Sequence, residues 1–260
     1  MTMREIQDLT LDLARGADRL DTLFQRRSAA FADWFRGRIF RHAYAVRVTA
    51  VPLSTLPGAI RVARQADGMY FQDRFQAKFE GSETEHVLLA PLRGATTRPI
   101  LRGCRAAQEE AEEFGAQLEI LDHGIIDLCW WRAPDKDAPS LYLGWLLGSV
   151  WLVLKLANWI RGLAEVAEWE YALELQLAAF SATAVGVSTA RAAVDYVPIL
   201  RLGNFADTIN VSPTLFPRLS WQSSSEEDEI LNLVMRDILD AGGVRQPSAR
   251  ITVSETALTK

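Results

Sequence analysis

Residues 117–131 read QLEILDHGIIDLCWW, in which two apolar runs flank the triplet Asp122-His123-Gly124. Glycine tolerates the positive φ that a tight turn requires, and each flanking run has the length of a strand. The stretch therefore predicts a β-hairpin, which makes antiparallel pairing the first feature expected of this fold.

Further strands are expected on the N-terminal side of the hairpin. Residues 43–53, AYAVRVTAVPL, are rich in β-branched residues and alternate, as is typical of a strand. Residues 69–80 alternate cleanly, and residues 85–92 and 98–102 also have the pattern of short strands. Residues 106–114, AAQEEAEEF, fit either a short acidic helix or a solvated loop. This half of the chain is therefore expected to be rich in β structure.

Helical periodicity marks the beginning of the chain and most of its second half. Residues 4–40 carry leucine and aromatic residues at mostly helical intervals, with no proline between them. Residues 140–161 and 163–184 are also expected to be helical. A last helix is expected to open at Ser225 and to end at Gly242-Gly243.

The segment LYLGWLLGSVWLVLKLANWI, residues 141–160, has the length of a transmembrane helix. Lys155 and Asn158 lie inside it, and both are costly in lipid. The polar positions continue at helical spacing through Arg161 and Glu165, so they share one side of a helix. This pattern predicts a helix with one polar stripe that is mostly buried in protein, and we expect no membrane partner.

The composition changes near residue 135, where a β-rich half gives way to a helical half. We interpret the halves as layers of one α+β domain over residues 1–248, with a β-rich layer at about 43–132 and a helical layer at about 139–243. An antiparallel sheet from the N-terminal half is expected to be covered by helices from the N-terminus and from the C-terminal half. Residues 249–260 are expected to form a flexible tail.

The 260-residue chain has a net charge of −5, which does not favour nucleic acid or anionic membranes, and its 49% of apolar residues excludes disorder. Its cysteines, Cys104 and Cys129, are too few for a disulfide framework or a zinc site, so we expect reduced thiols. The N-terminus is charged from residue 4 and lacks the apolar region of a signal peptide. We therefore expect a cytoplasmic protein.

No catalytic motif is recognisable. The patterns GxGxxG, GxxxxGK[ST] and GxSxG are absent, so we expect no catalytic residue, cofactor or metal and favour a non-enzymatic protein. One alternative is a cryptic metal-dependent hydrolase that uses Asp122, His123 and Asp127, with Glu119 nearby. A carboxylate beside a histidine can bind a metal or orient a general base. The competing interpretation is a hairpin turn that faces solvent.

A basic stretch with interleaved aromatic residues lies between residues 26 and 47. Arginines can follow a nucleic-acid backbone while aromatic rings stack on bases, so direct nucleic-acid binding is a second alternative. At helical spacing, however, the aromatics are typical of a core and the arginines of a solvated face that pairs with nearby acids. The candidate nucleic-acid-binding residues are Arg26, Arg27, Arg36, Arg38, Arg41 and Arg47.

The tryptophans between residues 130 and 169 are typical of a core or an interface rather than of a ligand site. Their number also favours a protein partner or a homo-oligomer, with the tryptophan-rich helical half as the docking surface. The set comprises Trp130, Trp131, Trp145, Trp151, Trp159 and Trp169.

Four segments together resemble the region that follows the nucleic-acid-binding domain in bacterial DNA-binding proteins of the Schlafen/AlbA type. They are FADWFRGRIFRHAYAVRVTAVPLS (31–54), RPILRG (98–103), EILDHGIIDL (119–128) and ILNLVMRDILDAGGVRQPS (230–248). The AlbA-like domain itself, with its acidic-lysine motif and Asn-Thr-x-Gly-Gly segment, is absent, so no DNA-binding residue carries over. The resemblance implies a non-catalytic accessory region, and the leading hypothesis is an interaction or regulatory module.

Overall fold

In the computed structural model the described residues are 3–36, 43–54, 92, 95–101, 103–108, 114–133, 140–165, 168–179, 184–188 and 208–244. The helices are α1 (Met3–Arg36), α4 (Leu143–Leu163), α5 (Glu227–Ala241) and the short 3₁₀ helix η3 (Ser224–Glu226). The strands are β1 (Tyr44–Pro52), β2 (Thr96–Ile100), β3 (Gly103–Ala107), β4 (Phe114–Leu121), β5 (Ile126–Arg132), β6 (Ser140–Tyr142), β7 (Tyr171–Ala179), β8 (Val185–Ser188), β9 (Thr208–Val211), β10 (Thr214–Leu215) and β11 (Leu219–Trp221).

Within the described residues, eight strands form one antiparallel sheet. Its order is β10-β7-β1-β5-β4-β3-β2, and β11 also pairs with β7. The central strand β1 pairs with β5 on one side and with β7 on the other, so Arg47 lies opposite Cys129 and Gln176. A smaller sheet has the order β6-β8-β9, with β6 parallel to β8. The α+β class with an antiparallel sheet is thus confirmed.

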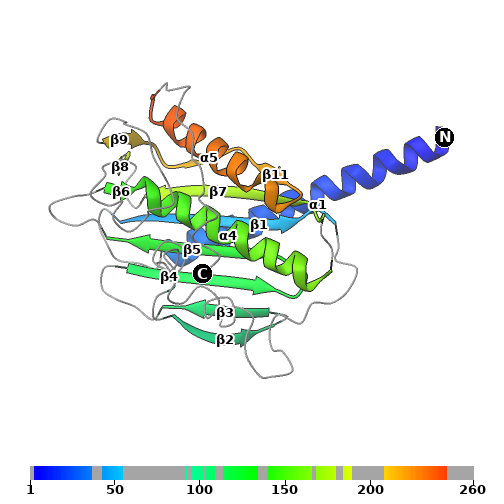
Figure 1. The fold of residues 1–260 in the computed structure, drawn as a ribbon, viewed down its shortest axis with the longest axis horizontal. Coiled ribbons are helices and arrows are strands. Elements are labelled where there is room, and N and C mark those ends of the chain that lie inside the picture. The colour runs from blue at the N-terminus through cyan, green and yellow to red at the C-terminus, as the bar shows by residue number, and fades with distance from the viewer. Residues whose placement is uncertain are drawn as a thin grey trace.

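Different helices cover the two faces of the large sheet, as Figure 1 shows. α4 lies across one face with α5 beside it, and α1 runs behind the opposite face. Successive strand residues point to opposite faces. In β1, Val46 and Val48 therefore enter the main core under α4, while Ala45 and Val51 pack on the side of α1. Helices from the N-terminus and from the second half cover the sheet, as the sequence predicts.

α4 is a core helix, and 72% of its most apolar 18-residue stretch is buried. Its polar stripe is paired inside the protein. Lys155 Nζ lies 2.7 Å from a carboxylate oxygen of Glu227 in α5, Asn158 donates to the same carboxylate, and Arg161 donates to two backbone carbonyls. Among the described residues, α4 is the one helix long and apolar enough to cross a membrane. Its burial is that of a central helix in a soluble α+β domain.

The helix expected over residues 163–184 is wrong. α4 ends at Leu163, and residues 171–179 form β7, which pairs with β1 along its whole length. The β7 sequence YALELQLAA is rich in alanine, leucine and glutamate, which favour helices in isolation. It also alternates large apolar residues with small or polar ones, and pairing at the centre of the sheet selects that period of two over helix propensity.

The hairpin at residues 117–131 is confirmed. β4 and β5 pair antiparallel, and Gly124 takes a φ of 86° in the turn between them. The strands expected at 43–53 and 98–102 correspond to β1 and β2, and α5 with η3 accounts for the last helix. Residues 106–114 were expected to form a short helix or a loop, but residues 106–107 belong to β3 and residue 114 begins β4. Leu92, the last residue of the strand expected over 85–92, is in a 3₁₀ conformation. The expectations for residues 69–80 and 249–260, and the remaining parts of these two, 85–91 and 109–113, lie outside the described residues.

Candidate functional site

Charged and polar side chains occupy the face of the sheet that α1 covers, and we name this set the ionic layer. Apolar contacts flank it at both ends of the buried part of α1. Phe31 and Phe35 pack with Cys129 and Trp131 at one end, and Phe24 belongs to a second cluster at the other. The ionic layer comprises Asp21, Arg27, Ser28, Arg47, Thr49, Arg105, Gln117, Glu119, Asp127, Glu174, Gln176 and Arg218.

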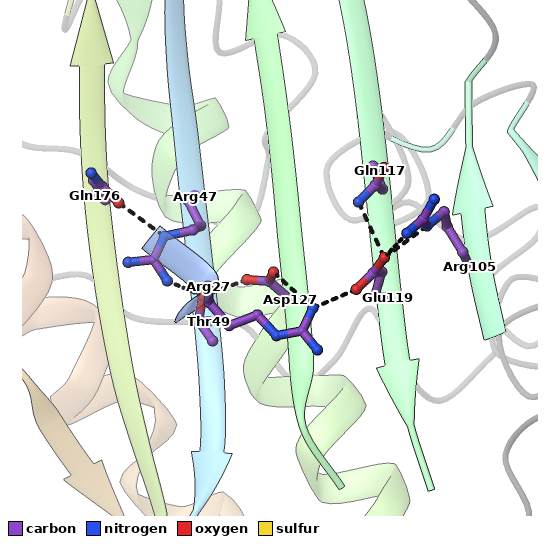
Figure 2. Close-up of polar contacts among 8 residues, drawn as sticks. All are labelled: Arg27, Arg47, Thr49, Arg105, Gln117, Glu119, Asp127 and Gln176. Carbon is purple, nitrogen blue, oxygen red and sulfur yellow. Dashed lines mark hydrogen bonds and ion pairs between the residues drawn. The ribbon is translucent and has the colours of Figure 1, made fainter. Parts of the chain in front are cut away.

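Arg27 links α1 to the carboxylates of the sheet. Its NH1 group bonds Glu119 and lies 3.6 Å from Asp127 Oδ2. The two acids are directly opposite each other on β4 and β5, and Arg105 Nε of β3 also donates to Glu119 at 2.7 Å. Figure 2 shows the guanidinium of Arg27 lying between the two carboxylates. One cation of the helix therefore contacts two neighbouring acids of the sheet.

Arg47 joins the central strands and is wholly buried. Its guanidinium bonds the Glu174 carboxylate on β7, and it donates to Gln176 Oε1 at 3.0 Å and to Thr49 Oγ1 at 2.6 Å. The Thr49 hydroxyl in turn donates to Asp127 on β5. A buried charge is costly unless it is paired and hydrogen-bonded, and this chain of contacts supplies both. It runs through three adjacent strands, as Figure 2 shows in part.

Arg218 ties α1 to the same layer from the β10–β11 side of the sheet. Its Nε donates to Glu174 at 2.9 Å, and its NH1 group bonds Asp21 of α1. The guanidinium also lies 4.4 Å from the ring centroid of Phe24, within the range of a cation–π contact. Ser28 adds a hydrogen bond from α1 to β7. Polar groups spaced along α1 therefore specify where this helix sits on the sheet.

Burial governs the acid–base behaviour of the layer. It raises the pKa of Asp127 above its usual value, against the opposing effects of Arg27 and of the hydrogen bond from Thr49. Burial also raises the pKa of the Cys129 thiol well above its usual value. A buried, protonated thiol is a poor nucleophile and a poor metal ligand. Neither group is therefore arranged as an activated nucleophile.

The residues of the hydrolase alternative do not converge. His123 is exposed in the β4–β5 turn and Asp122 is half-buried next to it, whereas Glu119 and Asp127 belong to the ionic layer under α1. No group of three or more His, Cys, Asp or Glu side chains that could hold a metal ion occurs in the part of the chain that the structure describes. The geometry thus gives no support to metal chemistry at this hairpin.

The candidate nucleic-acid-binding arginines occupy different environments. Arg27 and Arg47 are engaged inside the ionic layer, and Arg47 has no exposed surface. Arg26 and Arg36 are exposed on α1, where Arg36 lies 3.5 Å from Asp33. The described members of the set therefore do not form one surface that could follow a phosphate backbone. Outside the described residues lie Arg38 and Arg41.

The tryptophan set belongs to the core and not to a docking surface. All of its members except Trp145 and Trp159 are at most 3% exposed. Those two are half-buried and pack against the main core. The docking surface expected on the tryptophan-rich half is therefore not supported, and these side chains serve the packing of the fold.

α1 continues beyond the sheet toward its N-terminus. Leu20 and Leu23 pack on the apolar cluster at the edge of the ionic layer, while Ala17, Asp18 and Arg19 are exposed. We name residues 3–19 the arm, which at 1.5 Å per residue corresponds to about 25 Å of helix. Figure 1 shows this part of α1 extending past the sheet, with the N-terminus at its tip.

Sequence reasoning missed the ionic layer because its partners are far apart in the chain, as in the pair Arg27 and Glu119, which are separated by 92 positions. A signal for it was nevertheless present. Arg47, Asp127 and Glu174 each place a charged residue in a largely apolar strand, in AYAVRVTAV, IIDLCWW and YALELQLAA. Charged residues are almost never fully buried unless they are paired. Charged positions of this kind on several strands indicate a shared buried face.

Comparisons of the chain with protein-family models, with curated proteins and with solved structures found no match.

Proposed function

We propose that this chain is a non-catalytic interaction or regulatory module and that the arm of α1 is its docking element. The observation that carries the proposal is the extension of the arm beyond the sheet (Figure 1). Helices shorter than about 15 residues are marginal in water on their own, because packing of an amphipathic face supplies most helical stability. A helical arm of roughly that length, with no strand of the described residues beneath it, is well suited to packing against a partner.

The sequence of the arm supports the same conclusion. Ile6, Leu9 and Leu13 recur at intervals of three and four, which places these positions on one side of a helix. The same spacing continues to Leu20 and Phe24, which pack toward the sheet. The side of α1 that contacts the sheet thus carries apolar positions onward into the arm. Such a continued stripe favours a second protein surface as its partner.

The ionic layer supports a non-catalytic role. Glu119, Asp127 and Glu174 are already matched by guanidinium groups and threonine, so they are engaged in contacts within the fold. The accessory role agrees with what the resemblance to Schlafen/AlbA-type proteins implies. We place the module in the cytoplasm, beside a separate nucleic-acid-binding chain.

Direct nucleic-acid binding is the weaker alternative, because two of the candidate arginines are committed to internal ion pairs. Fluorescence anisotropy with labelled single- and double-stranded DNA at low salt distinguishes the alternatives, since phosphate contacts are strongest there. If the chain binds DNA and the double variant Arg26→Ala, Arg36→Ala does not, direct nucleic-acid binding is favoured over docking through the arm.

The arm is tested with the same substitution on its two sides. Leu13→Glu introduces a charge into the apolar stripe, and Leu11→Glu introduces it about 200° around the helix. Each tagged chain is expressed in cells, and the proteins that it captures, copies of itself included, are quantified by mass spectrometry. We expect Leu13→Glu to lower capture about tenfold, the loss that corresponds to 1.4 kcal/mol, and Leu11→Glu to leave it unchanged.

Equal capture by the two variants would contradict the docking role of the arm. Because the arm lies beyond the sheet, both variants should unfold at the same denaturant concentration as the unmodified chain. That measurement separates a lost partner from a damaged fold.

A further inference from the structure

The apolar stripe of the arm has the spacing of a coiled coil. In such helices apolar residues occupy positions a and d of a seven-residue repeat, so the intervals alternate between three and four. α1 meets this spacing over three repeats, from the arm into the part that lies on the sheet. The positions are Ile6, Leu9, Leu13, Gly16, Leu20 and Leu23.

Gly16 stands near the middle of this series, where a glycine disfavours the helix. Contacts among the described residues give no reason for it, because a Cβ added at Gly16 would meet no heavy atom of theirs within 4 Å. Glycine is the residue that lets another backbone approach closely. At a d position it leaves room for a large residue of a facing helix, such as leucine at position 13.

Charged residues flank the stripe at position g, immediately before each a position. This series is acidic in the first half of the arm, at Glu5 and Asp12, and basic further on, at Arg19 and Arg26. Arg19 and Arg26, whose side chains the structure describes, are both exposed. Over residues 5–26 the sign of the charge along this edge of α1 therefore changes from acidic to basic, and the next g position, Asp33, lies beyond the stripe.

A reversal of sign along one edge matches antiparallel pairing with an identical helix. In a parallel pair each g position faces an e position, and the e positions of the arm are the uncharged Met3, Thr10 and Ala17. In an antiparallel pair g faces g in reverse order, so the acidic half of one helix lies along the basic half of the other. Complementary charges at these edge positions set partner choice and orientation.

The same antiparallel register places the N-terminal tip of the second arm beside partly exposed apolar residues at the edge of the first copy's sheet. Leu20, Leu23, Leu53 and Ile100 are only partly buried around the cluster under this end of α1. Antiparallel alignment of the a and d positions sets position 6 of one helix beside position 23 of the other. These partly exposed residues would then be covered.

From these observations we propose that the arm is a dimerisation element, and that it binds the arm of a second copy of this chain in antiparallel orientation. The proposal rests on the docking role proposed above and names its partner. Asp12 of each copy then lies opposite Arg19 of the second copy, and Glu5 opposite Arg26.

Charge reversal with rescue tests the pairing. One chain carries Arg19→Glu and Arg26→Glu, which makes the four g positions from 5 to 26 acidic. The other carries Glu5→Arg and Asp12→Arg, which makes the same four positions basic. Light scattering after gel filtration at about 100 µM and low salt reports the mass, because weak ionic pairs are strongest there. We expect the unmodified chain at twice 29.0 kDa, each reversed chain at 29.0 kDa, and the equimolar mixture back at twice that mass.

A monomeric unmodified chain would overturn the proposal. A dimer that persists in both reversed chains, or a mixture that stays monomeric, would overturn it as well. If the unmodified chain is monomeric but Leu13→Glu still abolishes the capture of other proteins, the docking role of the arm stands and only the second copy is wrong. Equal thermal unfolding of the two reversed chains, which are both expected to be monomeric, checks that the folds are intact.

Discussion

The two faces of the large sheet hold their helices by opposite means. Under α4 the contacts are almost entirely apolar, with Val46 and Val48 of β1 packed against fully buried leucines of the helix. Under α1 the same strand presents Arg47 and Thr49 to the ionic layer. Apolar burial is strong but non-directional, whereas hydrogen-bonded ion pairs form in few geometries. The α4 face therefore supplies stability, and the α1 face fixes the position of one helix.

This difference explains why an interface so rich in charge holds the helix that carries the arm. Buried ion pairs contribute little net stability over apolar packing, because desolvation offsets the Coulomb attraction. Arg27, Ser28 and Asp21 nevertheless give α1 one register on the sheet. A fixed register gives the arm a fixed direction, which is what a docking element requires.

The largest loss of stability is expected from a substitution on the α4 face. Leu147 is fully buried in the main core, so Leu147→Ala removes apolar contacts and leaves a cavity. We expect a loss of about 3–5 kcal/mol in the free energy of unfolding, measured by urea denaturation. The matched control is Leu163→Ala at the exposed end of the same helix, where the loss should stay within about 0.5 kcal/mol. Similar losses at both positions would refute the assignment of stability to this face.

A smaller loss of stability is expected when a buried charge of the ionic layer loses one of its partners. Arg47→Met keeps the apolar volume but removes a partner of the buried Glu174, at an expected cost of about 3 kcal/mol. This cost is near the lower limit expected for breaking a buried ion pair, because Arg218 still contacts Glu174. Adding Glu174→Gln should recover most of the loss, since the group that lost Arg47 is then an uncharged amide. A double variant as unstable as the sum of the single ones would mean that the pair is not coupled.

The smallest effect is a dependence of the free energy of unfolding on pH, and it arises from Asp127 on the α1 face. Burial raises the pKa of Asp127 from its usual 3.8, so the folded chain binds this proton to a higher pH than the unfolded chain does. The contribution of Asp127 to stability is therefore fully present below the unfolded pKa and declines as the pH rises through the folded pKa. Asp127→Asn should remove this decline in urea denaturation between pH 4 and pH 8, whereas Asp18→Asn on the exposed side of α1 should not. Parallel profiles for Asp127→Asn and the unmodified chain would show that Asp127 does not titrate in this way.

The features predictable from the sequence are those decided by near neighbours. Gly124 and the two apolar runs beside it predict the β4–β5 hairpin. The length of the apolar segment 141–160 and its single polar stripe predict α4 as a buried helix. β7 was misassigned because its alanine, leucine and glutamate favour a helix until β1 pairs with it. That pairing joins Arg47 to residue 176, far along the chain, and no local pattern specifies it.

The candidate site was only partly predictable for the same reason. The arginines of α1 were recognised as a group, but whether Arg27 faces solvent or Glu119 depends on which strands lie beneath the helix. The extent of the arm depends likewise on where the sheet ends. Strand order and sheet width are properties of the assembled fold, and the periodicity of one segment does not determine them.

The strand order also shapes how the chain is made. β1 lies between β5 and β7, and β7 is separated from β5 along the sequence by α4. A ribosome completes β1 through β5 well before β7 emerges, so a nascent sheet then carries an unpaired apolar edge along β1. Such an edge is a template for aggregation, and slow non-local pairing prolongs its exposure. Synthesis of residues 133–179 is therefore the interval in which this protein depends most on rapid elongation or on a chaperone.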